Sequence, residues 1–163
     1  MILTQEQIEY HFGKFVYTSN PDGSIKILSK DFLENIIPFV YVFNSGKKLI
    51  WKVHKKIYIP LLKSFDLIKS TGLENLIDYE DTQKVGGCFV PRHILWNTSK
   101  PLSHHSWGIA FDINPTSNPY NKPPTPNQTK LAGIFINNGF EWGAKWKTPD
   151  PQHFEYTAVN KRN

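Results

Sequence analysis

The strongest constraint on the fold of this chain is a segment of strict alternation at residues 107–114. Every second position carries a bulky apolar side chain, and these positions are Trp107, Ile109, Phe111 and Ile113. The positions between them are small or polar, namely Gly108, Ala110, Asp112 and Asn114. Because successive side chains of a strand point to opposite faces, the pattern predicts a strand over 107–113 with one face in the core. The other face then carries the Asp112 carboxylate beside two very small residues.

Two histidines complete a possible set of metal ligands around Asp112. His105 stands just before the predicted strand, and His153 begins a second short strand predicted at residues 153–156. Two imidazoles and one carboxylate form the three-ligand set of a catalytic zinc site, whose fourth position stays open for water. This arrangement requires His105 to reach back from a turn, because seven positions separate it from Asp112. The alternative is a hydrogen-bonded Asp112 and a packed His153, but burying an unpaired carboxylate is costly.

Further motifs accompany these residues in a fixed order. They are Phe89-x-x-Arg92, Ser103-x-His105-x-x-Gly108-x-Ala110-x-Asp112, Asn114-Pro115, Asn118-Pro119, Gly139-Phe140-x-Trp142-Gly143 and Asp150-x-x-His153. Together they resemble the zinc peptidases that cut peptidoglycan stem peptides, the D-Ala-D-Ala carboxypeptidases and the L-alanyl-D-glutamate endopeptidases, which include phage endolysins. The resemblance covers about residues 50–157.

The resemblance implies an α+β fold of the D-Ala-D-Ala peptidase and hedgehog-like type, in which helices pack a small antiparallel sheet that carries the zinc site. A length of 163 residues suits a single catalytic domain over 1–163. Within it, residues from about 50 to 157 form the expected peptidase core, and residues 1–50 form a variable N-terminal addition.

The resemblance also implies a role for each polar residue of the site. His105, Asp112 and His153 would hold one Zn²⁺ per chain. Asp150 would take a proton from water and pass it to the leaving amine, as hydrolysis of a peptide bond needs a base beside the metal. Arg92 would hold a substrate carboxylate or the developing oxyanion. The alternative for Asp150 is that it only forms the turn before Pro151. The alternative for Arg92 is that it is an ordinary surface residue.

Three further polar positions adjoin these residues. Ser103 is expected to order the turn before His105 or to bond substrate. Glu155 alternates with His153 on one strand face, so it could orient that imidazole. His104 is left out of the site, because a side chain adjacent to a ligand in the sequence is expected to point away. Cys88 is interpreted as a small buried residue rather than a nucleophile.

These observations predict a zinc-dependent stem-peptide hydrolase, most closely resembling the L-alanyl-D-glutamate endopeptidase branch, in a phage or prophage lysin. A D-Ala-D-Ala carboxypeptidase is the alternative within the family, and a non-catalytic wall-binding module that keeps the metal is the alternative outside it. The presence of Asp150 argues against the module, since a purely structural zinc needs no base.

The charge of the chain bears on its partners. The net charge is +5, and residues 47–69 hold seven lysines and a single acid, Asp66. Such a block attracts polyanions, and an anionic cell wall or outer-membrane surface fits it, as does a merely solvated helix face. Nucleic acid is not expected, because no arginine-rich stripe or nucleic-acid motif accompanies the lysines.

The location of the protein is also predicted from the sequence. No run approaches the roughly 18 apolar residues of a membrane helix. The first residues lack the pattern of a signal peptide. We therefore expect a monomer made in the bacterial host cytoplasm that acts on the wall after release or delivery.

The remaining elements follow from periodicity and capping signals. A capping box at Thr4 predicts a first helix that ends at Gly13, and the turn at residues 20–24 predicts a hairpin. A main helix is predicted over residues 54–71 and packed on the metal-bearing sheet, with Pro60 kinking it or marking a later start. Residues 73–82 are predicted to form a strand. A second capping box, formed by Thr125 and Gln128, predicts a helix that ends near residue 138.

Overall fold

The computed structural model describes residues 2–159, which form three separate antiparallel sheets with helices packed between them. Because helices accompany small sheets in which all described strand pairs are antiparallel, the predicted α+β class is confirmed. The strands are β1 (Tyr17–Ser19), β2 (Ile25–Ile27), β3 (Ile36–Val42), β4 (Lys48–His54), β5 (Ala110–Asp112), β6 (Phe140–Trp142) and β7 (His153–Tyr156). The α-helices are α1 (Gln5–Phe12), α2 (Lys30–Leu33), α3 (Tyr58–Ser70), α4 (Tyr79–Lys84) and α5 (Pro126–Asn137).

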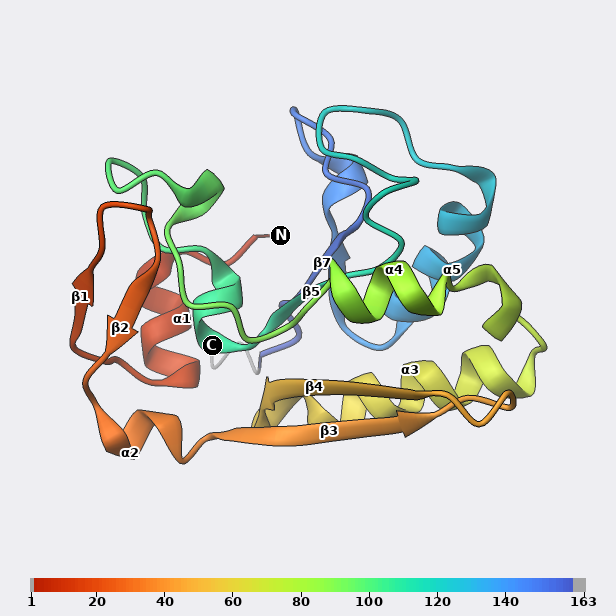
Figure 1. Ribbon diagram of the computed structural model, residues 1–163, viewed down its shortest axis with the longest axis horizontal. Helices are drawn as coiled ribbons and strands as arrows, with labels where there is room; N and C mark the ends of the chain where they lie inside the picture. The colour runs from red at the N-terminus through yellow and green to blue at the C-terminus, as the bar shows by residue number, and fades with distance from the viewer. Residues whose placement is uncertain (1, 160–163) are drawn as a thin grey trace.

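The sheet that carries the candidate metal ligands lies at the centre of the molecule (Figure 1). Its strand order is β5-β7-β6, and Asp112 lies directly opposite His153 in the register. The core on its apolar face is a cluster of aromatic rings, in which Phe111, Phe135 and Phe154 have centroids 4.8–5.5 Å apart. Phe135 belongs to α5, so α5 is the helix that covers this sheet.

The alternation at residues 107–114 predicted burial correctly but made the strand too long. Trp107, Ile109, Phe111 and Ile113 are all buried. The strand itself covers only Ala110–Asp112, because Gly108 adopts a left-handed conformation with φ +64° after a 3-10 turn at His104–Trp107. A Cβ on Gly108 would lie 3.0 Å from the backbone nitrogen of His54, so the chain passes too close to β4 for a larger residue.

The main helix begins later than predicted and packs elsewhere. Residues 48–54 pair with β3 as strand β4, so the helix starts only at Tyr58 and Pro60 falls in its first turn. The helix contacts mainly β3 and α5 rather than the metal-bearing sheet. The predicted packing was wrong because the β3–β4 hairpin buries a full apolar face of its own, which α3 covers.

The predicted strand at residues 73–82 is wrong. The segment forms a 3-10 turn at Glu74–Leu76 and then helix α4. Asp78 caps α4 by accepting a hydrogen bond from the backbone of Asp81, and acidic residues fill the first turn. Asn114 supports this cap, because its side-chain oxygen accepts from the backbone nitrogen of Asp78 at 2.7 Å.

Both predicted capping segments begin helices. Thr4 and Gln7 form the complete reciprocal capping box of α1. At α5 the Thr125 side chain caps the helix, but the Gln128 amide instead donates to the buried carbonyls of Ile113 and Pro151. The glutamine thus ties the end of β5 to the segment before β7, and the Pro151 carbonyl also accepts from the indole nitrogen of Trp142 in β6 at 2.8 Å.

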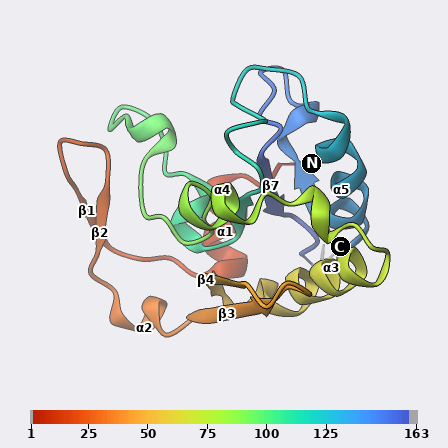
Figure 2. The ribbon, with the colours of Figure 1, turned by 45° about the vertical axis from the view of Figure 1, so that its right-hand side comes forward.

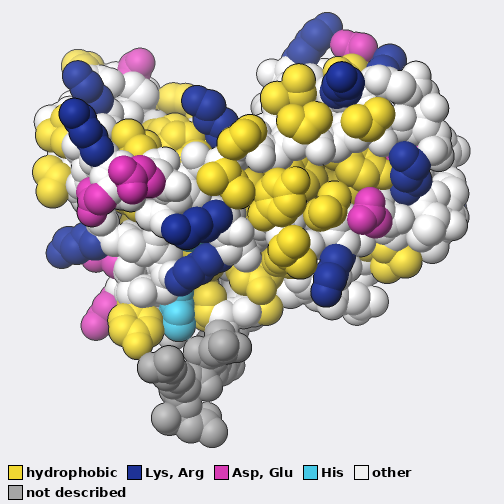
Figure 3. Space-filling model, turned by 90° about the horizontal axis from the view of Figure 1, so that it is seen from below, with side chains coloured by type: hydrophobic (Ala, Val, Ile, Leu, Met, Phe, Trp, Pro, Cys, Tyr) yellow, Lys and Arg dark blue, Asp and Glu magenta, His cyan; other side chains and the backbone are white. Residues whose placement is uncertain are grey.

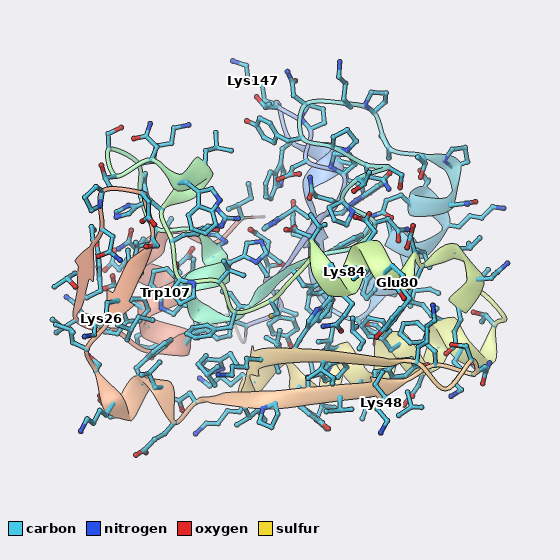
Figure 4. The ribbon with its side chains drawn as sticks, viewed as in Figure 1. Lys26, Lys48, Glu80, Lys84, Trp107 and Lys147 are labelled. Carbon is cyan, nitrogen blue, oxygen red and sulfur yellow. The ribbon has the colours of Figure 1, made fainter. Side chains whose placement is uncertain are left out.

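Two arms rise on either side of β5 and β7 (Figures 1 and 2). The left arm contains the β1–β2 hairpin and the loop after residue 90, and the right arm contains the segments between β5 and α5 and between β6 and β7. Trp107 joins the left arm to the core, since its indole nitrogen donates to the carbonyl of Gly13 at 2.9 Å (Figure 4).

The lysine-rich segment is largely exposed. On the outward face of the β3–β4 hairpin, Val40 and Ile50 pair across the strands, and Lys48 and Lys52 stand on either side of Ile50 along β4. Seen from below, hydrophobic side chains gather at the centre of this face, with lysine or arginine side chains around them (Figure 3). Across α4, Glu80 forms ion pairs with Lys84 and Lys47 at 3.1 and 3.2 Å (Figure 4). Within residues 2–159, no helix combines the length and the apolar character needed to span a bilayer.

Candidate metal centre

Three side chains converge at the centre of the molecule. The Nδ1 atom of His153 lies 3.2 Å from Oδ1 of Asp112, and the Nε2 atom of His105 lies 3.5 Å from Oδ2 of Asp112. The same two imidazole nitrogens are 3.3 Å apart. Cross-strand pairing of β5 with β7 brings Asp112 and His153 together, and the 3-10 turn before Gly108 brings His105 back toward them. The geometry therefore contains the turn that the predicted site required.

Hydrogen bonds orient both imidazoles toward Asp112. His105 donates from Nδ1 to the carbonyl oxygen of Cys88 at 3.1 Å, and His153 donates from Nε2 to Oε2 of Glu155 at 3.2 Å. Each ring thus keeps its other nitrogen as a lone-pair donor. Three such donor atoms facing one another repel unless a cation lies between them. The chemistry of this set, two nitrogens and one carboxylate, fits a zinc ion.

The charges around the site favour a cation. Burial opposes ionisation of Asp112, but the neighbouring histidines outweigh burial and hold its pKa well below the usual range. Burial also opposes protonation of His153, yet its hydrogen bonds to Asp112 and Glu155 raise its pKa to about 10. Two ionised carboxylates therefore surround one imidazole, and this arrangement favours bound positive charge.

Glu155 connects His104, which the sequence analysis left out, to the candidate metal site. Its Oε2 atom accepts from His104 at 2.7 Å as well as from His153. Burial would raise the pKa of Glu155, but these two histidines outweigh burial and lower it to about 2. His104 was excluded on the expectation that neighbouring side chains diverge. In a 3-10 turn, however, successive side chains are about 120° apart, so His104 and His105 can both face the site.

A cavity of about 430 Å³ opens beside the convergent ligands. It is lined by all four remaining predicted site residues, Arg92, Ser103, Asp150 and Glu155, as well as by His153. The structure therefore places all seven residues of the predicted site in or beside this cavity.

Asp150 is held at the edge of this cavity. Its backbone nitrogen donates to the carbonyl of Gly143 at 3.0 Å, and a Cβ on Gly143 would lie 2.5 Å from the Asp150 carbonyl oxygen. Its Oδ1 atom is buried and has no hydrogen-bond partner among the described residues. Burial raises the pKa of Asp150 above that of an ordinary aspartate, and its charge interacts with those of His153 and Asp112. A partly desolvated carboxylate of this kind suits a proton acceptor.

Arg92 lies on the opposite side of the cavity. Its backbone nitrogen donates to the Ser106 hydroxyl at 2.9 Å, and its guanidinium donates to the His93 carbonyl at 3.3 Å and lies 5.3 Å from the Trp96 ring centroid. Burial lowers the pKa of Arg92. Ser103 orders the turn before His105 through its backbone, because its nitrogen donates to the Arg92 carbonyl and its carbonyl accepts from Ser106.

Other candidates occupy different positions. Cys88 is buried, its thiol donates to the carbonyl of Gly108, and burial raises the pKa of the thiol well above the usual value, so it is unsuited to act as a nucleophile. Trp142 is buried in the core. Trp146 lines the cavity, with its ring centroid 5.2 Å from that of His153.

Comparison with known proteins agrees with this geometry. A fold with a His-Asp-His cluster beside a cavity defines a candidate metallopeptidase class. Residues 96–156 match the model of a family described as D-alanyl-D-alanine carboxypeptidase, which supports a zinc peptidase of the family that the motifs resemble. The matched segment contains the three convergent residues and Asp150. No curated protein and no solved structure matches the chain.

Proposed function

We propose that this protein is a zinc-dependent peptidase that cuts the stem peptide of peptidoglycan, and that it cuts between L-Ala and D-Glu as a phage- or prophage-type lysin. The observation that carries the proposal is the convergence of His105, Asp112 and His153 beside a cavity that also holds Asp150 and Arg92. The family match supports the peptidase chemistry.

In this proposal the three convergent residues hold one zinc ion per chain. Bound zinc supplies Lewis-acid polarisation of the scissile carbonyl and lowers the pKa of a water molecule. Asp150 accepts the proton of the attacking water and delivers it to the leaving amine as the C–N bond breaks. Arg92 holds negative charge on the substrate. Glu155 and the Cys88 carbonyl keep the two imidazoles in the orientation that binding needs.

The lining of the cavity supports an anionic peptide as substrate. Arg92, Lys100 and Lys147 contribute positive charge, and Lys147 projects from the upper end of the right arm (Figure 4). Tyr120 and Trp146 contribute aromatic surface to the same cavity. A stem peptide carries free carboxylates on small aliphatic residues, which suits this combination. The lysine-rich face described above could add attraction to an anionic wall or outer-membrane surface.

Digestion of purified sacculi tests this function. The protein should release new amino groups, and a chelator should abolish the release. Mass spectrometry of the products should show muramic acid that ends in L-Ala, with the rest of the stem released intact. Loss of only the terminal D-Ala would instead assign the D-Ala-D-Ala carboxypeptidase, the activity named by the matched family. Binding of sacculi without any new amino groups would assign a non-catalytic wall-binding module.

A further inference from the structure

One side of the cavity is formed by residues 93–102, which we name the wall loop. Ile94, Leu95 and Lys100 of this loop line the cavity, and Arg92 directly precedes it. Leu95 and Trp96 have φ values of 53° and 55°, in the left-handed region that side chains other than glycine rarely adopt. Such conformations persist only where the surrounding structure holds them. The question is therefore which contacts hold the wall loop.

His93 closes the base of the wall loop. It pairs with Leu102 in an isolated antiparallel bridge, and its Nδ1 atom donates to the carbonyl of Lys100 at 2.6 Å. Because Nδ1 carries the hydrogen, the Nε2 atom of the neutral ring is an acceptor. His93 is buried, so this second nitrogen requires a donor from the protein.

That donor comes from the β1–β2 hairpin. The Ser19 hydroxyl donates to Nε2 of His93 at 2.8 Å, and the backbone nitrogen of His93 donates to the carbonyl of Gly23 at 2.9 Å. Ser24 pairs with Arg92 in a second isolated bridge. Figures 1 and 2 both show the hairpin side by side with the segment that leads into the wall loop.

Gly23 allows the hairpin to approach this closely. It has φ +83°, and a Cβ at this position would lie 2.1 Å from the carbonyl oxygen of Trp96. The turn at residues 20–24 is itself ordered by Asp22, whose carboxylate accepts from both the backbone and the hydroxyl of Ser24. The hairpin therefore presents a preformed tip to the back of the wall loop, on the side away from the cavity.

We propose that the β1–β2 hairpin is a specificity element of the peptidase. It holds the wall loop so that Arg92 and Lys100 keep the spacing needed to bind an acidic peptide. Ser19 acts as a positioning residue through His93, without touching substrate. The hairpin lies outside the segment that matches the family model, so it is a property of this chain's N-terminal region. The substrate part of this inference rests on the proposed function, whereas the holding of the loop does not.

Three variants of β1 test the proposal. Ser19→Ala removes the donor to His93, Ser19→Thr keeps a hydroxyl, and Thr18→Ala removes a neighbouring exposed side chain that makes no described contact with His93. Loss of one hydrogen bond weakens a held conformation by about three- to tenfold. Ser19→Ala should therefore raise KM for muropeptides by about three- to tenfold and leave kcat within about twofold. Ser19→Thr and Thr18→Ala should match the unmodified protein.

Amide hydrogen exchange provides a readout that needs no activity. The amides of Ile94 and Trp96 are hydrogen-bonded to Pro101 and His93, so their exchange should accelerate in Ser19→Ala and not in Thr18→Ala. If the unmodified protein cleaves no stem peptide, the proposed function fails, and exchange alone still decides whether the hairpin holds the loop. Unchanged exchange in Ser19→Ala, or an unchanged KM in active enzyme, overturns the inference.

A general loss of stability gives a different pattern. It would lower the folded fraction, and hence kcat, in Ser19→Ala and Thr18→Ala alike, without a change in KM, and that result also overturns the inference. Gly23→Ala provides a second route, since its Cβ must displace the Trp96 carbonyl. It should raise KM at least as much as Ser19→Ala does.

Discussion

The sheet that carries the metal ligands and the wall loop that faces it are held in different ways. In the sheet, Asp112 and His153 are register partners over a packed aromatic core, and hydrogen bonds to the Cys88 carbonyl and to Glu155 orient the imidazoles of His105 and His153. The wall loop is exposed between its buried ends, contains left-handed Leu95 and Trp96, and is held to the β1–β2 hairpin by a few polar contacts. In the proposed peptidase, the residues of the chemistry therefore lie in a packed part of the fold, whereas the residues that we propose for substrate binding lie in a part held by a few replaceable contacts.

The largest effect is expected from loss of a ligand in the rigid region. The purified protein should carry about one zinc ion per chain, and either His105→Ala or His153→Ala should lose the metal and all measurable hydrolysis of sacculi. Metal analysis after dialysis measures the first result and release of amino groups the second. Stoichiometric zinc in the double variant would refute the ligand assignment.

Removing the proposed base should separate chemistry from metal binding. Asp150→Asn keeps the size of the side chain but cannot accept the proton, and general acid–base groups contribute about 10²–10⁴-fold. Activity should fall at least about a hundredfold, while zinc content and thermal unfolding stay unchanged. Asp112→Asn should instead lose zinc, and added zinc should restore part of its activity. Full activity of zinc-loaded Asp150→Asn would assign the base to another group.

A pH titration of stability probes His54 of β4, whose backbone nitrogen donates to the Gly108 carbonyl just before β5. His54 is buried, donates from Nε2 to the carbonyl of Phe12, and burial lowers its pKa to about 4. The unfolded chain protonates this histidine near its ordinary value of 6.5, so folding disfavours the proton. The stability linked to His54 is therefore complete above pH 6.5 and is lost as the pH falls toward 4, by about 3 kcal/mol.

Chemical denaturation at a series of pH values measures this effect. The variant His54→Gln keeps an amide donor for the Phe12 carbonyl and does not titrate. Its free energy of unfolding should vary less between pH 6.5 and 4 than that of the unmodified protein. Equal pH dependence in the two proteins would show that His54 does not control the loss of stability between pH 6.5 and 4.

A smaller effect is expected from the group that orients His153. Glu155→Gln leaves the ligands in place but replaces the carboxylate that accepts from His153 and His104. Loss of such an orienting partner typically weakens metal affinity 10–100-fold. Competition with a zinc chelator measures this change, and Glu6→Gln, an exposed position in α1, serves as the matched control. Equal zinc affinity in Glu155→Gln and Glu6→Gln would exclude an orienting role.

The sequence predicted the site better than the surrounding fold. Short-range patterns were enough to predict the convergent residues, because the alternation at residues 107–114 and the Asp150-x-x-His153 spacing can both be read within a few positions of the chain. The strand predicted at residues 73–82 and the long main helix failed because distant contacts decided them, namely the Asn114 bond to Asp78 and the pairing of residues 48–54 with β3. His104 was missed because neighbouring side chains were expected to diverge, whereas the 3-10 turn at His104–Trp107 lets both histidines face the site.

Cys88 has a practical consequence for studying the motion of the cavity wall. It is the single cysteine of the chain, and its buried thiol has a raised pKa, so maleimide reagents should leave it unmodified in the folded protein. A cysteine introduced at the exposed Thr98 would then be the one reactive thiol. A fluorophore or spin label attached there would report any movement of the wall loop in the folded protein, with no background labelling to remove.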